Sequence, residues 1–205
     1  MDLHTQGREG RGVHLQSGDP MILPHCVAIV RSQDERDGAA LMKLAEKLRF
    51  GAVVAPGVRI VPHDFDHRLV FFLVHFDFDM AGRHQAIKAV RQSGSVSLSF
   101  APVVLFLRDA SQAEILSNVE LGFDDVVSVP ADGRAIATRL ARQVGQEHLY
   151  IETRNYLGPD RHRLDRELAV PPSRKPEEPH ARLTILRTIE DGVAIVRRQE
   201  AHKAH

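Results

Sequence analysis

Imidazole and carboxylate side chains are concentrated in one stretch near the middle of the chain. The stretch contains, in order, His63, Asp64, Asp66, His67, His75, Asp77 and Asp79. Its last three members alternate along the chain, so an extended backbone would place them on one face. Such a set could bind a transition metal and support a metal-dependent hydrolase. The simpler interpretation takes 63–67 as a solvated loop.

Other signatures of enzymatic chemistry are missing from the sequence. It contains no P-loop, Gly-x-Gly-x-x-Gly, Gly-x-Ser-x-Gly or Cys-x-x-Cys motif. The single cysteine, Cys26, excludes an internal disulfide, and its apolar neighbours favour a buried strand residue over a reactive thiol. We therefore predict that the protein is not an enzyme and that it uses no cofactor and no bound metal.

Charge and composition narrow the class of protein further. Lys+Arg and Asp+Glu both count 27, so the balance gives no support to general binding of polyanions. No segment approaches the roughly 20 apolar residues of a membrane span, and 1–20 has no signal-peptide core. These features predict a globular cytoplasmic protein with no membrane partner.

Short apolar runs alternate with amphipathic stretches, and this pattern predicts the elements that must position the polar side chains. Strands are expected at 26–30, 52–54, 69–76, 102–107 and 126–129. Helices are expected around 41–48 and at 83–92, 111–121 and 132–144. The alternation favours a parallel sheet covered on both faces. Between the second and third strands, Pro62 and a β-branched run predict a helix that is short, distorted or absent.

The chain is expected to have one domain with extensions at both ends. We expect a disordered tail at 1–22, a domain at 23–148, an arginine- and proline-rich linker at 149–182 and a disordered end at 199–205. Asp191-Gly192 between two apolar runs predicts a possible β-hairpin at 183–198. An isolated hairpin is marginal in water, so it should dock on the domain or on a partner.

Two local motifs, taken with this order of elements, resemble the receiver domain of bacterial response regulators over about 24–146. Asp77-Phe-Asp-Met-Ala-Gly82 is similar to the family's phosphoacceptor segment, with Ala81 where proline is usual. Leu121-Gly-Phe-Asp-Asp-Val-Val-Ser-Val-Pro130 is similar to its Gly-Ala-Asp-Asp-x-x-x-Lys-Pro segment, without the lysine. The resemblance implies a flavodoxin-like α/β fold with a five-stranded parallel sheet.

The resemblance also implies that the phosphorylation site is degenerate. Asp77 falls at the phosphoacceptor position, but Arg31 and Ser32 fall where the family places its acidic Mg²⁺-binding pair. Leu107 replaces the hydroxyl that reports phosphorylation, and Val129 replaces the lysine. Phosphoryl transfer to a carboxylate needs these groups to neutralise charge.

Two roles of Asp77 stay open at this point. It could be a relic held by Arg31 or by backbone donors, which we favour. Alternatively, it could still accept phosphate, with Asp34 and Asp79 forming a makeshift metal site.

Binding surfaces are expected at two places. In receivers the face of the fourth helix, fifth strand and fifth helix is the usual dimer and effector surface. By resemblance it would here contain Gln112, Glu114, Asn118, Val127 and Arg139. It would contact signalling proteins or a second copy of the chain, although a plain solvated face is equally compatible with these residue types.

The second place is the tail. Tyr156-x-Gly-Pro-Asp-Arg-x-Arg163 is similar to a Tyr-x-Gly-Pro-Asp-Arg-Arg-Arg segment found in bacterial signalling proteins. The motif residues are Tyr156, Gly158, Pro159, Asp160, Arg161 and Arg163. Gly158-Pro159 would fix a turn, and the arginines would suit an acidic protein surface, a phosphate or a cyclic dinucleotide. A solvated basic linker is the alternative, and the tail is too short for a DNA-binding helix-turn-helix.

The favoured hypothesis is therefore a phosphorylation-independent pseudo-receiver that acts as an adaptor in bacterial signalling. A nucleotide or small-molecule receptor, a phosphorylatable receiver and a metal-dependent enzyme are the alternatives.

Overall fold

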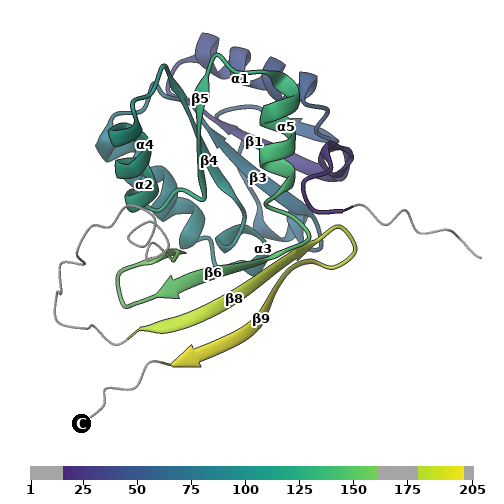
Figure 1. Cartoon of the computed structure of the whole chain (residues 1–205), viewed down its shortest axis with the longest axis vertical. Helices are drawn as coiled ribbons and strands as arrows, with labels where there is room; N and C mark the ends of the chain where they lie inside the picture. The colour runs from purple at the N-terminus through teal and green to yellow at the C-terminus, as the bar shows by residue number, and fades with distance from the viewer. Residues whose placement is uncertain (1–15, 161–179, 201–205) are drawn as a thin grey trace, which may run out of the picture.

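The computed structural model describes residues 16–160 and 180–200, which form two β-sheets (Figure 1). The central sheet is parallel, with strand order β2-β1-β3-β4-β5. Its strands are β1 (Cys26–Arg31), β2 (Ala52–Val54), β3 (Leu69–Val74), β4 (Val103–Arg108) and β5 (Asp125–Val129). All six residues of β3 are buried, as expected for a strand covered on both faces. This strand order is the flavodoxin-like arrangement, which confirms the predicted fold class.

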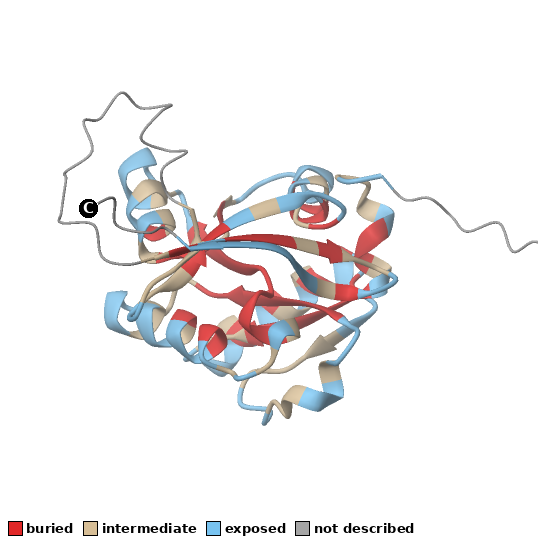
Figure 2. Ribbon diagram, turned by 90° about the horizontal axis from the view of Figure 1, so that it is seen from below, coloured by how far each residue is buried: buried red, intermediate tan, exposed pale blue. Residues whose placement is uncertain are grey.

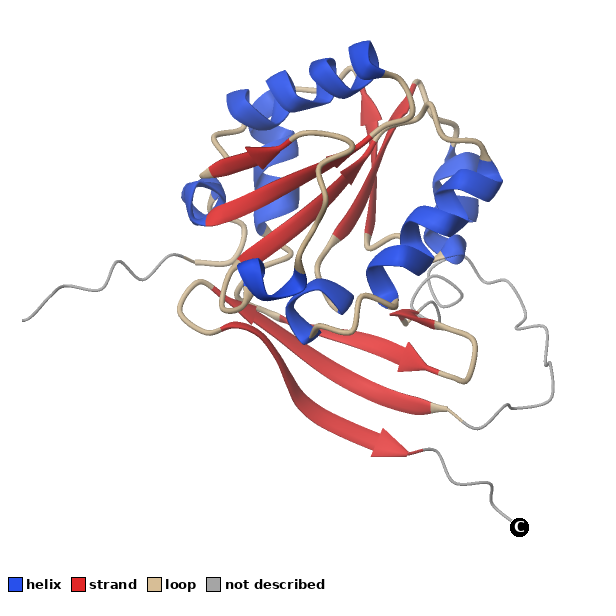
Figure 3. Cartoon of the chain, turned by 180° about the vertical axis from the view of Figure 1, so that it is seen from behind, coloured by secondary structure: helices blue, strands red, loops and turns tan. Residues whose placement is uncertain are grey.

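Helices cover both faces of the parallel sheet (Figure 3). On one face, α1 (Glu35–Lys47) and α5 (Gly133–Ala141) pack Leu41 and Leu140 against the side chain of Phe71 and its neighbours. On the other face, the helices are α2 (Met80–Arg91), α3 (Val96–Ser99) and α4 (Gln112–Leu121). The longer helices begin at N-cap side chains, for example Asp34 for α1 and the capping box of Ser111 and Glu114 for α4. The buried residues accordingly follow the sheet and the inner sides of the helices (Figure 2).

The second helix of the pattern is absent, as the sequence predicted. The connection between β2 and β3 contains only a 3₁₀ turn, η2 (Pro62–Phe65). Proline lacks the N–H that a longer helix would need, and the preceding β-branched residues favour an extended backbone. The sheet face beside this connection is therefore covered by a loop and by α2 and α3.

The amino-terminal boundary differs from the prediction of a disordered tail at 1–22. A 3₁₀ helix, η1 (Pro20–His25), precedes β1, and Asp19 caps it. Its Ile22 and Leu23 are buried in the same cluster as α1 and α5, which explains why this segment is part of the domain. Cys26 is buried as predicted, and burial raises the pKa of its thiol to about 12.

The carboxyl-terminal segment forms a second sheet where a linker was predicted. Its strand order is β7-β6-β8-β9, and all pairs are antiparallel. The strands are β6 (Glu147–Glu152), β7 (Leu157–Pro159), β8 (Ala181–Thr188) and β9 (Gly192–Glu200). The predicted hairpin is present as β8 and β9, and Gly192 adopts a φ of 76° beside its turn. The predicted linker at 149–182 is wrong at both ends, because β6 pairs with β7 and with β8 of the hairpin, β8 begins at Ala181, and Tyr150 is buried.

This second sheet lies across the amino-terminal ends of the parallel strands (Figure 1). Its inner face places Tyr150, Leu183 and Ile185 in one cluster with Phe100, which precedes β4. Because strands of a parallel sheet point the same way, this end is opposite to the carboxyl-terminal edge where Asp77 lies. The described residues contain no helix that could cross a membrane.

A buried ionic cluster joins the two sheets. The Asp124 carboxylate, just before β5, accepts hydrogen bonds from Arg91 at 2.5 Å and from Arg187 at 3.1 Å. It also accepts one from the Tyr150 hydroxyl and one from the Val103 N–H at 2.7 Å. Burial alone would raise the pKa of Asp124, but the two guanidinium groups outweigh it and hold that pKa below its usual range.

Candidate functional site

Asp77 lies in the loop that follows β3, at the carboxyl-terminal edge of the parallel sheet. One of its oxygens, Oδ2, accepts three hydrogen bonds from the loop after β1. The donors are the Ser32 hydroxyl at 2.7 Å, the Gln33 N–H at 2.7 Å and the Asp34 N–H at 2.8 Å. The loop that would carry the acidic pair of a receiver therefore supplies donors that hold the aspartate.

These donors set the ionisation of Asp77. Burial of the carboxyl group raises its pKa, but the hydrogen bonds from Asp34, Ser32 and Gln33 together outweigh burial, and His75 adds a smaller lowering effect. The pKa of Asp77 is consequently lowered from its ordinary value. The carboxylate is thus ionised at neutral pH and already solvated by protein donors.

Replacing Ser32 by alanine should destabilise the protein by about 1.5 kcal/mol at pH 7, because a hydrogen bond to a charged group is lost. The lowered pKa of Asp77 contributes stability that is present above the unfolded-state pKa of about 3.9 and is lost as the pH falls through the folded-state pKa. The difference between wild type and Ser32→Ala should therefore shrink below about pH 4. Urea unfolding of wild type and Ser32→Ala, followed by far-UV circular dichroism at pH 7 and at pH 3, measures this difference in stability.

A matched control for this prediction is Ser117→Ala in α4. The Ser117 hydroxyl donates to the uncharged carbonyl of Glu114 at 3.0 Å. Its removal should have a small effect that does not change with pH. A Ser32→Ala effect of equal size at pH 7 and pH 3 would contradict the assigned role of the hydrogen bond to Asp77.

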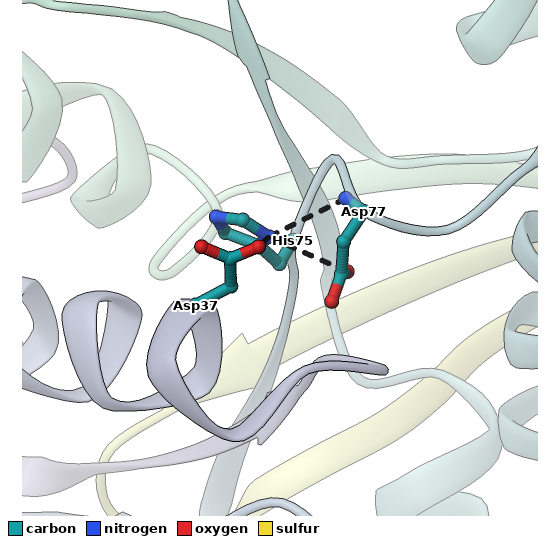
Figure 4. A group of neighbouring side chains, drawn as sticks. All are labelled: Asp37, His75 and Asp77. Carbon is teal, nitrogen blue, oxygen red and sulfur yellow. Dashed lines mark hydrogen bonds and ion pairs between the residues drawn. The ribbon is translucent and has the colours of Figure 1, made fainter.

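The second oxygen of Asp77 faces two groups that complete a small cluster (Figure 4). His75 Nδ1 lies 3.3 Å from Asp77 Oδ1 and 3.8 Å from Asp37 Oδ2. The side chain of His75 is 9% exposed and that of Asp77 is 11% exposed. Asp77 Oδ1 itself is buried without a hydrogen-bond partner among the described residues. These three side chains are close enough together to hold a metal ion, although His75 Nδ1 also accepts a hydrogen bond from the Asp77 N–H at 3.3 Å.

One imidazole nitrogen and two carboxylate oxygens suit a transition metal better than Mg²⁺. The three ligand atoms all lie within 4.8 Å of one another. Asp37 was missed in the sequence, although a carboxylate in the first turn of the helix after β1 necessarily lies near the carboxyl-terminal edge of the sheet. The feature of the sequence that could have identified Asp37 is its place in the first turn of this helix, not its spacing from His75.

The other members of the predicted histidine and aspartate stretch do not join this cluster. Asp79 is the N-cap of α2 and accepts a hydrogen bond from the Gly82 N–H at 2.7 Å. His63 and Asp64 form an exposed pair with each other in η2. The extended backbone that would have aligned His75, Asp77 and Asp79 ends at Val74, where β3 stops. A makeshift metal site of Asp34 and Asp79 is also not formed, since both side chains cap helices.

The other residues that the sequence predicted for a degenerate phosphorylation site are Arg31, Ser32, Leu107 and Val129, of which Ser32 donates to Asp77 as described above. The Arg31 guanidinium lies over the Phe72 ring, 5.9 Å from its centroid, and does not pair with Asp77 as the sequence had suggested. Leu107 is 5% exposed and packs in the cluster under α2 and α4. Val129 packs against the cluster under α1 and α5. Neither Leu107 nor Val129 offers a hydrogen-bonding side chain to a phosphoryl group.

The predicted interaction surface is only partly a surface. Asn118 and Val127 are 1% and 3% exposed, so both are removed from it. Asn118 instead accepts from Arg83 at 3.2 Å and donates to the Glu114 carbonyl at 2.7 Å. Arg139 is half-exposed and forms a two-nitrogen pair with Asp125. Gln112 and Glu114 are exposed on α4.

The described part of the tail motif, Tyr156 to Asp160, is built into the second sheet. The Tyr156 hydroxyl donates to the Pro159 carbonyl at 3.1 Å. A Cβ at Gly158 would lie 2.5 Å from the Tyr156 hydroxyl, which explains the glycine at this place. Tyr156 also lies beside Gly122, the left-handed cap of α4. Arg161 and Arg163 lie outside the described residues.

The fold is a flavodoxin-like α/β domain to which a small antiparallel sheet is added. No protein-family model matches the chain, and no curated protein matches it. Among solved structures, the chain is similar to a pilus assembly-related protein from Burkholderia pseudomallei, with 22% identity over 60% of this chain and 95% of that chain and a TM-score of 0.45. It is also similar to the signal receiver domain of a signal transduction histidine kinase from Syntrophus aciditrophicus, with 16% identity over 58% of this chain and 89% of that chain and a TM-score of 0.37.

Proposed function

We propose that the chain is a pseudo-receiver that binds other proteins in bacterial signal transduction independently of phosphorylation. The observation that carries the proposal is the state of Asp77, whose Oδ2 is held by the Ser32 hydroxyl and two backbone N–H groups. A phosphoacceptor must present an accessible oxygen to the incoming phosphoryl group beside a bound Mg²⁺. Here the loop after β1 occupies Oδ2, Oδ1 is buried beside His75, and no acidic pair stands at Arg31 and Ser32.

Electrostatics at the same edge supports the proposal. Developing negative charge on a phosphoryl group would face Asp37, which no lysine at position 129 offsets. Phosphoryl transfer depends on preorganised cations, and a valine supplies none. A switch is therefore unsupported, and a single binding-competent conformation is the simplest state for such a domain.

Incubation of the full-length protein with acetyl phosphate and Mg²⁺ should give no phosphoryl adduct by intact mass. A receiver with an intact acidic pair serves as the positive control for the donor. A stoichiometric adduct that is lost in Asp77→Ala would overturn the proposal. Elemental analysis of the same preparation tests the metal-enzyme alternative, because a metal held by Asp37, His75 and Asp77 should be lost in His75→Gln.

The exposed side of α4 is the proposed contact surface for signalling proteins or a second copy of the chain. Gln112 and Glu120 are both exposed there, and neither side chain forms a hydrogen bond within the described part of the chain. Gln112→Arg/Glu120→Arg should abolish capture of a partner isolated with wild type. Glu46→Arg, on the exposed side of α1, is the matched control and should have no effect.

Asp77→Asn should also leave partner capture unchanged. It keeps the size of the side chain and removes the carboxylate that could accept a phosphoryl group. A partner set that changes with Asp77→Asn or with acetyl phosphate would show that binding depends on phosphorylation.

A further inference from the structure

The loop that replaces the missing helix leaves a cavity of about 330 Å³ on one face of the parallel sheet. It lies between the end of β1, the middle of β3, the loop after β2, and the helices α2 and α3. Its lining includes Arg31, Arg59, Phe72, Val90, Ser93 and Leu98. The volume is at the lower end of the range of roughly 300–1,000 Å³ for small-molecule sites. It is separate from the Asp77 cluster, whose residues do not line it.

The floor of the cavity is apolar. Phe72, Val90 and Leu98 are each at most 4% exposed and belong to the core cluster on this face. A helix in this interval would have packed on these side chains, as α1 does on the opposite face. The Phe72 ring, whose face the Arg31 guanidinium approaches to 5.9 Å from the centroid, and its aliphatic neighbours would favour a planar apolar group.

The rim of the cavity is cationic. Arg31 is half-buried, and its guanidinium lies 5.9 Å from the centroid of the Phe72 ring. Neither Arg31 nor Arg59 has a carboxylate partner in the described ranges 16–160 and 180–200, in contrast to Arg91, Arg139 and Arg187. Burial lowers the pKa of Arg31, as expected for a guanidinium removed from water without a compensating anion. Guanidinium groups bind carboxylates and phosphates through paired N–H donors.

We infer that this cavity binds a small molecule in which an oxyanion is joined to a flat apolar group. The oxyanion would pair with Arg31 and Arg59, and the apolar group would lie on Phe72, Val90 and Leu98. This inference goes beyond the proposed adaptor function and does not depend on it. It also differs from binding through the arginines of the tail, because it uses only residues of the receiver-type domain.

Titration of the full-length protein with 1-anilinonaphthalene-8-sulfonate, followed by its fluorescence, tests the inference. One equivalent should bind to wild type. Arg31→Met/Arg59→Met should weaken binding by at least about tenfold, because charge-assisted hydrogen bonds are lost. Ala89→Phe places a large side chain on an exposed lining position and should abolish binding. Arg134→Met, on the exposed side of α5, is the matched control and should bind like wild type.

Competition then identifies the ligand chemistry. 2-Naphthoate and 2-naphthyl phosphate should displace the probe, and whichever does so at lower concentration names the preferred oxyanion. 2-Naphthol and inorganic phosphate should each fail to displace the probe, because each has only one half of the required ligand.

Far-UV circular dichroism confirms that the variants are folded. If Arg31→Met unfolds the protein, Arg59→Met alone tests the rim. Absence of one-equivalent binding to wild type, or affinities of the arginine and Ala89→Phe variants within about twofold of wild type, would overturn the inference.

Discussion

Replacing Asp124 by asparagine is expected to destabilise the protein by about 3–5 kcal/mol, the cost of breaking a buried ion pair at one partner. Asp124 is the anion between two buried cations, Arg91 and Arg187, and its side chain is 3% exposed. Asparagine keeps the shape and one oxygen but removes the charge. Both guanidinium groups would then remain buried without a counter-ion.

Urea unfolding followed by far-UV circular dichroism measures this effect, since the chain has no tryptophan to report by fluorescence. The control is Asp125→Asn, one residue further along. Asp125 pairs with Arg139, whose side chain is 49% exposed, so solvent screens the pair and the loss should stay near 1 kcal/mol or below. Equal losses for the two variants would show that the cluster around Asp124 does not join the sheets as inferred.

Replacing Arg187 by methionine should also lower the free energy of unfolding strongly, and the destabilisation should be confined to the second sheet. Arg187 is fully buried in β8 and donates to the Phe100 carbonyl at 2.9 Å, to Gln143 and to the Tyr150 hydroxyl at 2.6 Å. The variant leaves these acceptors unsatisfied while Asp124 keeps Arg91. We expect a loss of about 3 kcal/mol, because the partners of a buried charge lose their donors.

Hydrogen exchange measured by mass spectrometry shows where the Arg187→Met effect falls. Amides of β6, β8 and β9 should lose protection, whereas those of β1 and β3 should keep theirs. Arg182→Met, an exposed position on the same strand, should exchange like wild type. Uniform loss of protection throughout the chain would mean that the second sheet does not open separately from the first.

The same contacts decide which variants are usable for mapping partners. A chain that ends at Gly145 would lack both Tyr150 and Arg187 and would uncover Phe100. Loss of binding by such a fragment would reflect the exposed core as much as a missing contact surface. Point substitutions on α4 are therefore the better probe of the proposed adaptor function.

Local patterns in the sequence were sufficient for the central domain. Apolar runs such as Leu69–Val74 predicted the parallel strands, since strands covered on both faces lack polar positions. Pro62 predicted that the second helix would be short, distorted or absent, and Asp191-Gly192 predicted the hairpin of β8 and β9. The short helix α3 and the 3₁₀ helix η1 were missed, because four to six residues give too little periodicity to recognise.

Beyond the hairpin of β8 and β9, the second sheet could not be predicted from local pattern, and the reason is chemical. Residues near 147–160 and Arg187 contain charged and polar side chains that normally indicate solvated segments. Their burial depends on Asp124, which is 63 positions from Arg187 in the chain and satisfies its charge. Likewise, Asn118 and Val127 were assigned to a surface that the packing of α4 and β5 removes from solvent.

The sequence by itself determined the parallel sheet, its longer helices and the missing helix between β2 and β3, because these depend on residue type and on periods of two or 3.6 residues. Only the tertiary structure decided which groups hold Asp77, that Asp37 joins His75, and that Arg187 joins the two sheets. Those contacts depend on side chains distant in sequence meeting at one edge of a sheet, and charge satisfaction there is a property of the folded arrangement.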